Sequence, residues 1–238
     1  MFLCVSGEAD IALGAHSFAP NAPRVLLFDF EGTLVDFQWN LRDAARDAKN
    51  ELRNLGFDPE SWEDNYATLR NRAVELAPQR GMDRRIVMER IDAIYDRYDH
   101  GASSRWSVFP DVRPVLPRLK REQHIQLGVV SNIGRRAIEN AFPRLGLADL
   151  FDLIITRNDV EMLKPNRAGI LIVLEKLGAQ KSDALFVGDS VTDVLGARDA
   201  GLPVAIIQGG ESARVALLAA QPDYLWKSFA EIETIFAT

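Results

Sequence analysis

The length, composition and charge of the chain are those of an ordinary globular protein. Its 238 residues can form one large domain, or a core domain with a smaller one inserted in it. The 34 acidic residues outnumber the 28 basic ones, and the formal net charge is −6. The chain therefore has no overall positive field that would attract nucleic acid or an anionic membrane surface, so we expect neither partner. An anionic ligand would need local positive charge.

The chain shows no signal of secretion or membrane insertion. Cys4 is the only cysteine, so an internal disulfide is impossible, which fits a reducing compartment. Residues 1–23 lack a basic start and a sustained apolar stretch. We interpret them as a flexible N-terminal extension or a start site placed too early, not as a signal peptide. No later stretch reaches the roughly 18 consecutive apolar residues of a membrane helix. We expect a cytoplasmic protein.

The segment RVLLFDFEGTLVD, residues 24–36, organises the rest of the chain. Its apolar run from Val25 to Phe28 predicts a buried parallel strand. The strand delivers Asp29 to its carboxyl end, where a tight turn containing Gly32 follows. Asp29 is therefore the first candidate functional residue.

Residues 37–105 have a helical pattern and no convincing strand. Apolar residues recur three or four positions apart, as on one face of a helix. The three expected helices run from Leu41 to Leu55, from Ser61 to Pro78 and from Asp83 to Gly101. Ser61 and Asp64 resemble a capping box at the start of the second helix. We expect a helical subdomain, residues 37–105, inserted into a core of residues 24–36 and 106–238.

After Phe109 the chain alternates between short apolar runs and amphipathic segments. The expected strands are residues 125–130, 153–156, 184–187, 204–207 and 224–226. The expected helices are residues 112–121, 135–142, 167–177, 194–200 and 212–220, and a last one that Ser228 and Glu231 open as a capping box. This alternation predicts an α/β fold with a doubly wound, Rossmann-like parallel sheet and right-handed crossovers. Such sheets bind ligands at the carboxyl ends of their strands.

Unusual polar residues follow several of the expected strands or lie in the loops between them. They are Asp29, Glu31, Ser131, Asn132, Lys164, Asp189 and Asp193. Because the carboxyl ends of parallel strands share one edge of the sheet, we expect these residues to meet. Several carboxylates in one place repel each other unless a cation lies among them, and a site of oxygen ligands suits Mg²⁺.

The order of the motifs DxEGT, Ser-Asn, Lys-Pro and GDxxxD resembles the haloacid dehalogenase superfamily. The resemblance covers about Val25 to Gly209, and four motifs in order make it specific. It is closest to the phosphatase branch with a helical cap of the C1 type, as in phosphoglycolate phosphatase-like members. Residues 37–105 correspond to that cap, which closes over the site and selects the substrate.

The resemblance implies a role for each motif residue. Asp29 would attack phosphorus and form an aspartyl phosphate. Asp29, Asp189 and the backbone carbonyl of Glu31 would hold Mg²⁺, with Asp193 as a further ligand or as a partner of the ligands. The groups implied to bind the substrate phosphate are Ser131, Asn132, backbone amides near Gly32, and Lys164. Lys164 would also orient Asp29 and neutralise charge.

Glu31 departs from the family pattern, because most of its phosphatases have aspartate there. That side chain protonates the leaving oxygen and then deprotonates the attacking water. Glutamate keeps the carboxyl group and adds one methylene, as in enolase-phosphatase-like members. We expect Glu31 to alter proton delivery while Mg²⁺ binding is unchanged. A dehalogenase or a phosphorylating ATPase is disfavoured, because each has a different residue type at this position.

The leading hypothesis is a phosphatase that acts on a small soluble phosphorylated metabolite, by default phosphoglycolate-like compounds or sugar phosphates. A sugar phosphomutase of the same fold is an alternative. So is a non-catalytic binding or regulatory module in which Glu31 marks a degenerate acid. Trp39, Asn40 and Arg42 lie close to the first motif and could face the leaving group, whereas Gly209-Gly210 is interpreted as a plain turn.

Overall fold

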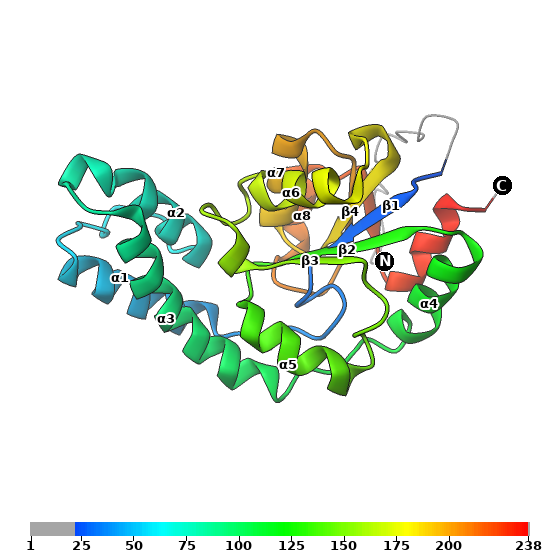
Figure 1. Cartoon of the computed structure of the whole chain (residues 1–238), viewed down its shortest axis with the longest axis horizontal. Coiled ribbons are helices and arrows are strands. Elements are labelled where there is room, and N and C mark those ends of the chain that lie inside the picture. Colours follow the sequence, from blue (N-terminus) through cyan, green and yellow to red (C-terminus); the bar gives the residue numbers. More distant parts are fainter. Residues whose placement is uncertain (1–21, 238) are drawn as a thin grey trace, which may run out of the picture.

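A computed structural model describes residues 22–237 (Figure 1). Most of the expected N-terminal extension, residues 1–21, therefore lies outside the described residues. Among the helices in the described part of the chain, none has both the length and the apolar character needed to cross a bilayer.

The core of the molecule is a parallel sheet of six strands. They are β1 (Val25–Phe28), β2 (Gln126–Val130), β3 (Leu153–Ile155), β4 (Ala184–Gly188), β5 (Val204–Ile207) and β6 (Tyr224–Trp226). The order across the sheet is β3-β2-β1-β4-β5-β6, and every neighbouring pair is parallel. The predicted doubly wound α/β fold is confirmed. The direction of winding reverses between β1 and β4, which is where such sheets form a ligand-binding crevice.

Helices cover both faces of the sheet, in two layers. They are α4 (Val112–Glu122), α5 (Arg135–Leu145), α6 (Ala168–Leu177), α7 (Val191–Ala200) and α8 (Arg214–Ala220). Figure 1 shows α6, α7 and α8 on one side of the sheet and α4 and α5 on the other. Side chains of β1 alternate between the two layers, because successive residues of a strand point to opposite faces. Val25 and Leu27 are buried with α6 and α7, whereas Leu26 and Phe28 are buried with α4 and α5.

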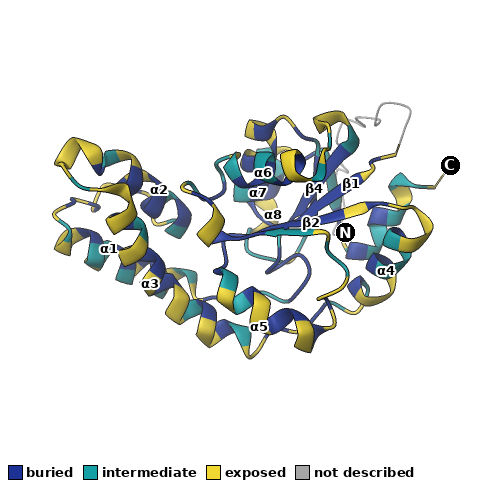
Figure 2. Ribbon diagram, in the orientation of Figure 1, coloured by how far each residue is buried: buried dark blue, intermediate teal, exposed yellow. Residues whose placement is uncertain are grey.

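The remaining helices lie between β1 and β2 in the sequence and project beyond the sheet (Figure 1). They are α1 (Leu41–Asn54), α2 (Tyr66–Leu76), a short 3₁₀ turn (Pro78–Arg80) and α3 (Arg84–Ser103). We call α1, α2 and α3 the helical insert. Their buried apolar side chains, apart from Ala67 of α2, belong to the same apolar cluster as one face of the sheet. Figure 2 shows the outer surfaces of these helices exposed and the strands buried.

Two helix starts differ from the expectation by three residues or more. Helix α2 begins at Tyr66, because the side chain of Asn65 accepts hydrogen bonds from Ala67 N and Thr68 N, both at 3.0 Å. The capping box expected from Ser61 and Asp64 was therefore wrong, and the carboxylate of Asp64 instead forms an ion pair with Lys49.

Helix α7 begins at Val191, three residues before the expected start. Ser190 caps it, since the Ser190 hydroxyl oxygen accepts from Asp193 N at 3.2 Å and the Asp193 carboxylate accepts from Ser190 N at 3.1 Å. At the end of the chain, the expected capping box of Ser228 and Glu231 is confirmed, although it opens a 3₁₀ helix, Phe229–Ile235.

Candidate active site

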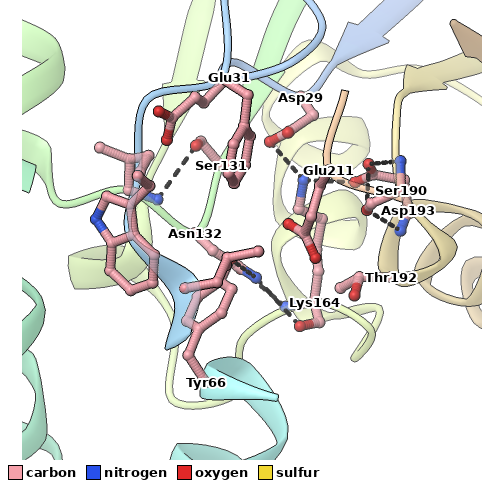
Figure 3. Close-up of a pocket in the computed structure, with 14 residues that line it drawn as sticks. Asp29, Glu31, Tyr66, Ser131, Asn132, Lys164, Ser190, Thr192, Asp193 and Glu211 are labelled. Carbon is pink, nitrogen blue, oxygen red and sulfur yellow. Dashed lines mark hydrogen bonds and ion pairs between the residues drawn. The ribbon is translucent and has the colours of Figure 1, made fainter. Parts of the chain in front are cut away.

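The predicted functional residues meet at the carboxyl ends of the central strands. Phe28 at the end of β1 pairs in register with Val129 of β2 and Val187 of β4, so the residues that follow these strands are neighbours. They surround a pocket of about 380 Å³, part of it open to solvent (Figure 3). The predicted residues among its lining are Asp29, Glu31, Ser131, Asn132, Lys164 and Asp193. Gly32 and Asp189 are buried beside the pocket.

Lys164 connects two of the carboxylates. Its Nζ lies 2.6 Å from Oδ1 of Asp29 and 2.7 Å from Oδ1 of Asp193. Burial lowers the pKa of Lys164, but Asp193 and Asp29 raise it more, so its pKa stands above the ordinary value. The lysine therefore remains a cation at the centre of the site, 135 residues from Asp29 in the sequence.

The aspartates have more negative charge than Lys164 can balance. Burial raises the pKa of Asp29 to about 6, with Lys164 lowering it and Asp193 raising it further. Burial also raises the pKa of Asp189 well above its ordinary value, and Asp193 and Asp29 add to the rise. Carboxylate oxygens of Asp29, Asp189 and Asp193 all lie within 4.8 Å of one another. This arrangement can hold a metal cation, because oxygen ligands of one small ion lie this close together.

Two glycines make room for Asp189. A Cβ at Gly32, which has a φ of +85°, would lie 2.2 Å from Oδ2 of Asp189, and a Cβ at Gly210 would lie 2.0 Å from the same atom. The hydroxyl of Thr33 donates to Oδ1 of Asp189 at 3.2 Å, and the backbone N–H of Glu211 donates to Oδ2 at 2.5 Å. The turn at Gly209-Gly210 is thus more than a plain turn, because residue 210 must lack a side chain for Asp189 to fit.

Asp193 caps a helix and belongs to the site at the same time. Its Oδ2 accepts hydrogen bonds from Asp189 N at 3.1 Å and from the Ser190 N and Oγ at 3.1 and 2.7 Å. Its Oδ1 accepts from Lys164. Both oxygens of Asp193 are therefore occupied by donors from the protein, and the helix start holds Lys164 in place.

Glu31 extends away from Asp29, on the side of Ser131 (Figure 3). Its Oε1 accepts hydrogen bonds from Gln38 N at 2.5 Å and from Trp106 Nε1 at 2.9 Å. Burial raises the pKa of Glu31 to about 7, although both hydrogen bonds lower it, and Asp29 adds a smaller increase. A carboxyl group with a pKa near neutrality can both give and take a proton, as a general acid and base must.

Ser131 and Asn132 follow β2 and have different surroundings. The Ser131 Oγ accepts from Ile133 N at 3.2 Å, which leaves its hydroxyl hydrogen free to be donated into the pocket. The Asn132 side chain pairs with the backbone of Lys164, accepting from its N at 3.0 Å and donating to its O at 3.2 Å. Its amide nitrogen also lies 3.2 Å from the hydroxyl oxygen of Tyr66. Asn132 thus fixes the loop that carries Lys164 and meets α2 of the helical insert.

Of the three residues expected near the leaving group, only Trp39 lines the pocket. Asn40 instead caps α1, where its side chain accepts from Asp43 N at 3.2 Å, and Arg42 is exposed. Sequence reasoning missed Tyr66 and Glu211, which also line the pocket. The signal for Glu211 was its place after β5, at the same edge of the sheet. Burial raises the pKa of Glu211 to about 7, with further increases from Asp193 and Asp29.

Comparison with known proteins identifies the family. The model of the family described as haloacid dehalogenase-like hydrolase matches residues 26–207. The chain belongs to this family. The match spans β1 to β5 and so includes every predicted site residue of this hydrolase.

The relatives of this hydrolase include phosphatases. It is 33% identical to the phosphoglycolate phosphatase of Pectobacterium atrosepticum, over 89% of this chain and 91% of that protein. It is 30% identical to that of Yersinia pseudotuberculosis, over 89% and 92%. The solved structure of a HAD phosphatase from Thermococcus onnurineus has a TM-score of 0.56 at 25% identity, over 90% of this chain and 98% of that one. The predicted family and enzyme class, a phosphatase-type hydrolase, are confirmed.

Proposed function

We propose that this hydrolase is a Mg²⁺-dependent phosphatase that cleaves small phosphomonoesters through an aspartyl-phosphate intermediate on Asp29. The observation that supports it most is the placement of Asp29 beside Lys164, 2.6 Å away, within a cluster of three aspartates. An anionic nucleophile and a phosphate dianion repel each other, so the reaction needs positive charge at this point.

The donor set fits a magnesium ion. It consists of carboxylate oxygens, which Mg²⁺ prefers, and three aspartates share a single paired lysine, Lys164. Asp29, Asp189 and the backbone carbonyl of Glu31 would hold the ion. Asp193 would act as a positioning residue, because its Oδ1 is ion-paired with Lys164 and its Oδ2 accepts three hydrogen bonds at the start of α7. When bound, the ion supplies charge neutralisation and polarises a phosphoryl oxygen.

Asp29 begins the reaction by forming a bond from a carboxylate oxygen to phosphorus, while the bond from phosphorus to the leaving oxygen breaks. Lys164 orients Asp29 through its ion pair and keeps its own proton, since its pKa is raised. The Ser131 hydroxyl, with its hydrogen free, donates to a phosphoryl oxygen. These groups hold the phosphoryl group beside the nucleophile.

Glu31 transfers the protons. In the first step its carboxyl group donates a proton to the leaving oxygen. In the second step its carboxylate takes a proton from water, whose oxygen bonds to phosphorus as the bond to Asp29 breaks. Inorganic phosphate and free Asp29 result. A pKa of about 7 suits both steps near neutral pH. The helical insert acts as the cap, since Tyr66 of α2 and Trp39, just before α1, line the pocket together with Asp29.

Hydrolysis of p-nitrophenyl phosphate tests the proposal. Purified protein with Mg²⁺ should release nitrophenol, and Asp29→Asn should abolish the release while the protein remains folded by circular dichroism. Equal rates for the two proteins would overturn the assignment of Asp29. A phosphosugar that isomerises without release of phosphate would favour the phosphomutase. Failure of Mg²⁺ and beryllium fluoride to bind together at Asp29 would favour the non-catalytic module.

A further inference from the structure

Part of the pocket lining is aromatic or aliphatic. These residues are Phe37, Trp39, Leu41 and Tyr66 from the helical insert and the segment leading to it, and Ile133 after β2; Glu211 after β5 lines the same pocket. Figure 3 shows Glu211 between Asp29 and Asp193 on one side and Tyr66 on the other. The charge of Glu211 also acts on Tyr66, because burial raises the pKa of the Tyr66 hydroxyl and Glu211 raises it further.

The carboxylate of Glu211 has no partner in the part of the chain that the structure describes. Its backbone N–H donates to Asp189, but any residue except proline supplies that donor, so the contact does not explain a carboxylate at this position. Among the residues that the structure describes, Lys164 is the only cation that lines the pocket, and it already forms ion pairs with Asp29 and Asp193. The site thus offers a free carboxylate and no free cation.

A hollow next to the pocket is also lined by acidic residues. This hollow, which shares Leu41, Tyr66 and Glu211 with the pocket, is also lined by Glu63 and Asp64. Asp64 is paired with Lys49, so the carboxylates there without an ion pair among the described residues are Glu63 and Glu211. A substrate with a carboxylate in its leaving group would be repelled by Glu211, and among the described residues that line the pocket and the hollow the only basic one, Lys164, is already paired. Unpaired like charges that lose water on binding are costly.

A cationic leaving group fits the same surface. The rings of Trp39 and Tyr66 lie 4.6 Å apart between centroids, at 55°, and aromatic faces attract ammonium groups. An ammonium beside Tyr66 would also approach the free carboxylate of Glu211. Carboxylate and aromatic ring together are the surroundings that proteins provide for ammonium ligands.

We propose that Glu211, with the aromatic wall of Trp39 and Tyr66, selects phosphomonoesters whose leaving group carries an ammonium group and disfavours those that carry a carboxylate. The inference rests on the proposed phosphatase function and concerns its substrate class. It sets this hydrolase apart from the relatives that are named for phosphoglycolate.

Three esters of similar size test the proposal in the full-length wild-type protein. They are 2-aminoethyl phosphate, 2-hydroxyethyl phosphate and 2-phosphoglycolate, which differ mainly in the charge of the group at the far carbon. At about pH 8 the amine is a cation and the carboxylate an anion. We expect kcat/KM to fall in that order, with the aminoethyl ester ahead of phosphoglycolate by tenfold or more, about 1.4 kcal/mol. An equal or reversed order would overturn the proposal.

Variants assign the preference to a residue. Glu211→Gln should reduce the ratio of kcat/KM between the aminoethyl ester and phosphoglycolate at least about fivefold. Glu175→Gln is the control, because Glu175 is exposed on α6 and lies outside the pocket. The ratio of kcat/KM between the two esters in this variant should equal that of the wild type. If Glu211→Gln changes the Mg²⁺ requirement and leaves the ratio intact, Glu211 serves the metal and the proposal fails.

The two proposals fail in different ways. Absence of Asp29-dependent hydrolysis of p-nitrophenyl phosphate would overturn the phosphatase itself. Asp29-dependent hydrolysis without the expected order of esters would overturn only the selection by Glu211.

Discussion

Trp106 donates its indole N–H to Oε1 of Glu31 at 2.9 Å, and the backbone N–H of Gln38 donates to the same oxygen at 2.5 Å. Gln38 precedes the helical insert and Trp106 follows it. The two chain segments that connect the helical insert to the sheet therefore both donate to Glu31, the residue proposed to transfer protons. A change in the position of the insert would shift both donors and, with them, the acidity of Glu31.

Trp106→Phe should move the pH optimum for 2-hydroxyethyl phosphate to higher pH. The hydrogen bond from Trp106 lowers the pKa of Glu31, which burial has raised to about 7, so its loss raises that pKa further. The protonated form of Glu31 then persists to higher pH, and the carboxylate form becomes populated only at higher pH. Phenylalanine keeps an aromatic ring beside Phe30. The rings of Trp106 and Phe30 pack edge to face, with their centroids 4.9 Å apart.

Trp226→Phe is the control, because Trp226 is a buried tryptophan of β6 outside the pocket. Its pH profile should match that of the wild type. A Trp106→Phe optimum that stays in place or moves to lower pH would contradict the proposed control of Glu31.

Glu31→Gln should separate proton transfer from metal binding. The amide cannot exchange protons, so kcat for an alkyl phosphate should fall about a hundredfold or more. The Mg²⁺ concentration for half-maximal activity should change little, because the proposed contact comes from the backbone carbonyl of residue 31. Steady-state kinetics over a range of Mg²⁺ concentrations measure both. Losses of similar size in both quantities would contradict the backbone contact.

The sequence predicted the parts of the site that depend on local pattern. An apolar run followed by Asp29 and Gly32 indicated a buried strand and its turn, and the parallel sheet then placed Lys164 and Asp189 at the same edge. Asp193 was expected at the site. In the structure it also caps α7, since its Oδ2 accepts from Ser190 N while its Oδ1 accepts from Lys164.

Residues that act through tertiary packing escaped prediction. Trp106 and Glu31 are 75 positions apart, and no motif marks a tryptophan that donates to a carboxylate. Glu211 follows a strand but has no motif partner. The start of α2 was misplaced because Ser61, Asp64 and Asn65 can all cap a helix. In the folded chain Asn65 accepts from the first backbone amides of α2, whereas Asp64 pairs with Lys49.

Without metal, the protein should lose stability as pH rises from about 4 to about 7. The pKa of Asp29 is about 6 and those of Glu31 and Glu211 about 7, all above their ordinary values. The folded state therefore keeps protons that the unfolded chain has released, and the free energy of unfolding falls across this interval and levels off above it. Thermal unfolding in a chelator should show a lower midpoint at about pH 8 than at about pH 5.

Added Mg²⁺ should raise that midpoint more at the higher pH, because the carboxylates are then ionised and available. Asp189→Asn, which removes one of the proposed ligands, should weaken this stabilisation. A midpoint that rises with pH in chelator would contradict the raised pKa values of the carboxylates.

Arg157 joins the core to the helical insert through buried charges. It follows β3, is fully buried, and its guanidinium lies 2.7 Å from Oδ2 of Asp99 on α3 and also pairs with Asp96. Asp99 is buried as well and accepts from Trp39 Nε1 and Gly134 N, both at 2.9 Å. Removal of the arginine would leave Asp99 in the interior without its counter-charge.

Arg157→Met should therefore destabilise the protein by about 3–5 kcal/mol in urea unfolding. Burial raises the pKa of Asp99 while Arg157 lowers it, so in the variant Asp99 takes up a proton more readily. The loss should be smaller at about pH 5 than at about pH 8, because a neutral Asp99 tolerates burial. Arg167→Met is the matched control: Arg167 is exposed and lies 4.0 Å from Asp199, so its loss should stay below about 1 kcal/mol. Equal losses in the two variants, or a loss for Arg157→Met that does not change with pH, would show that Asp99 does not depend on Arg157 for its charge.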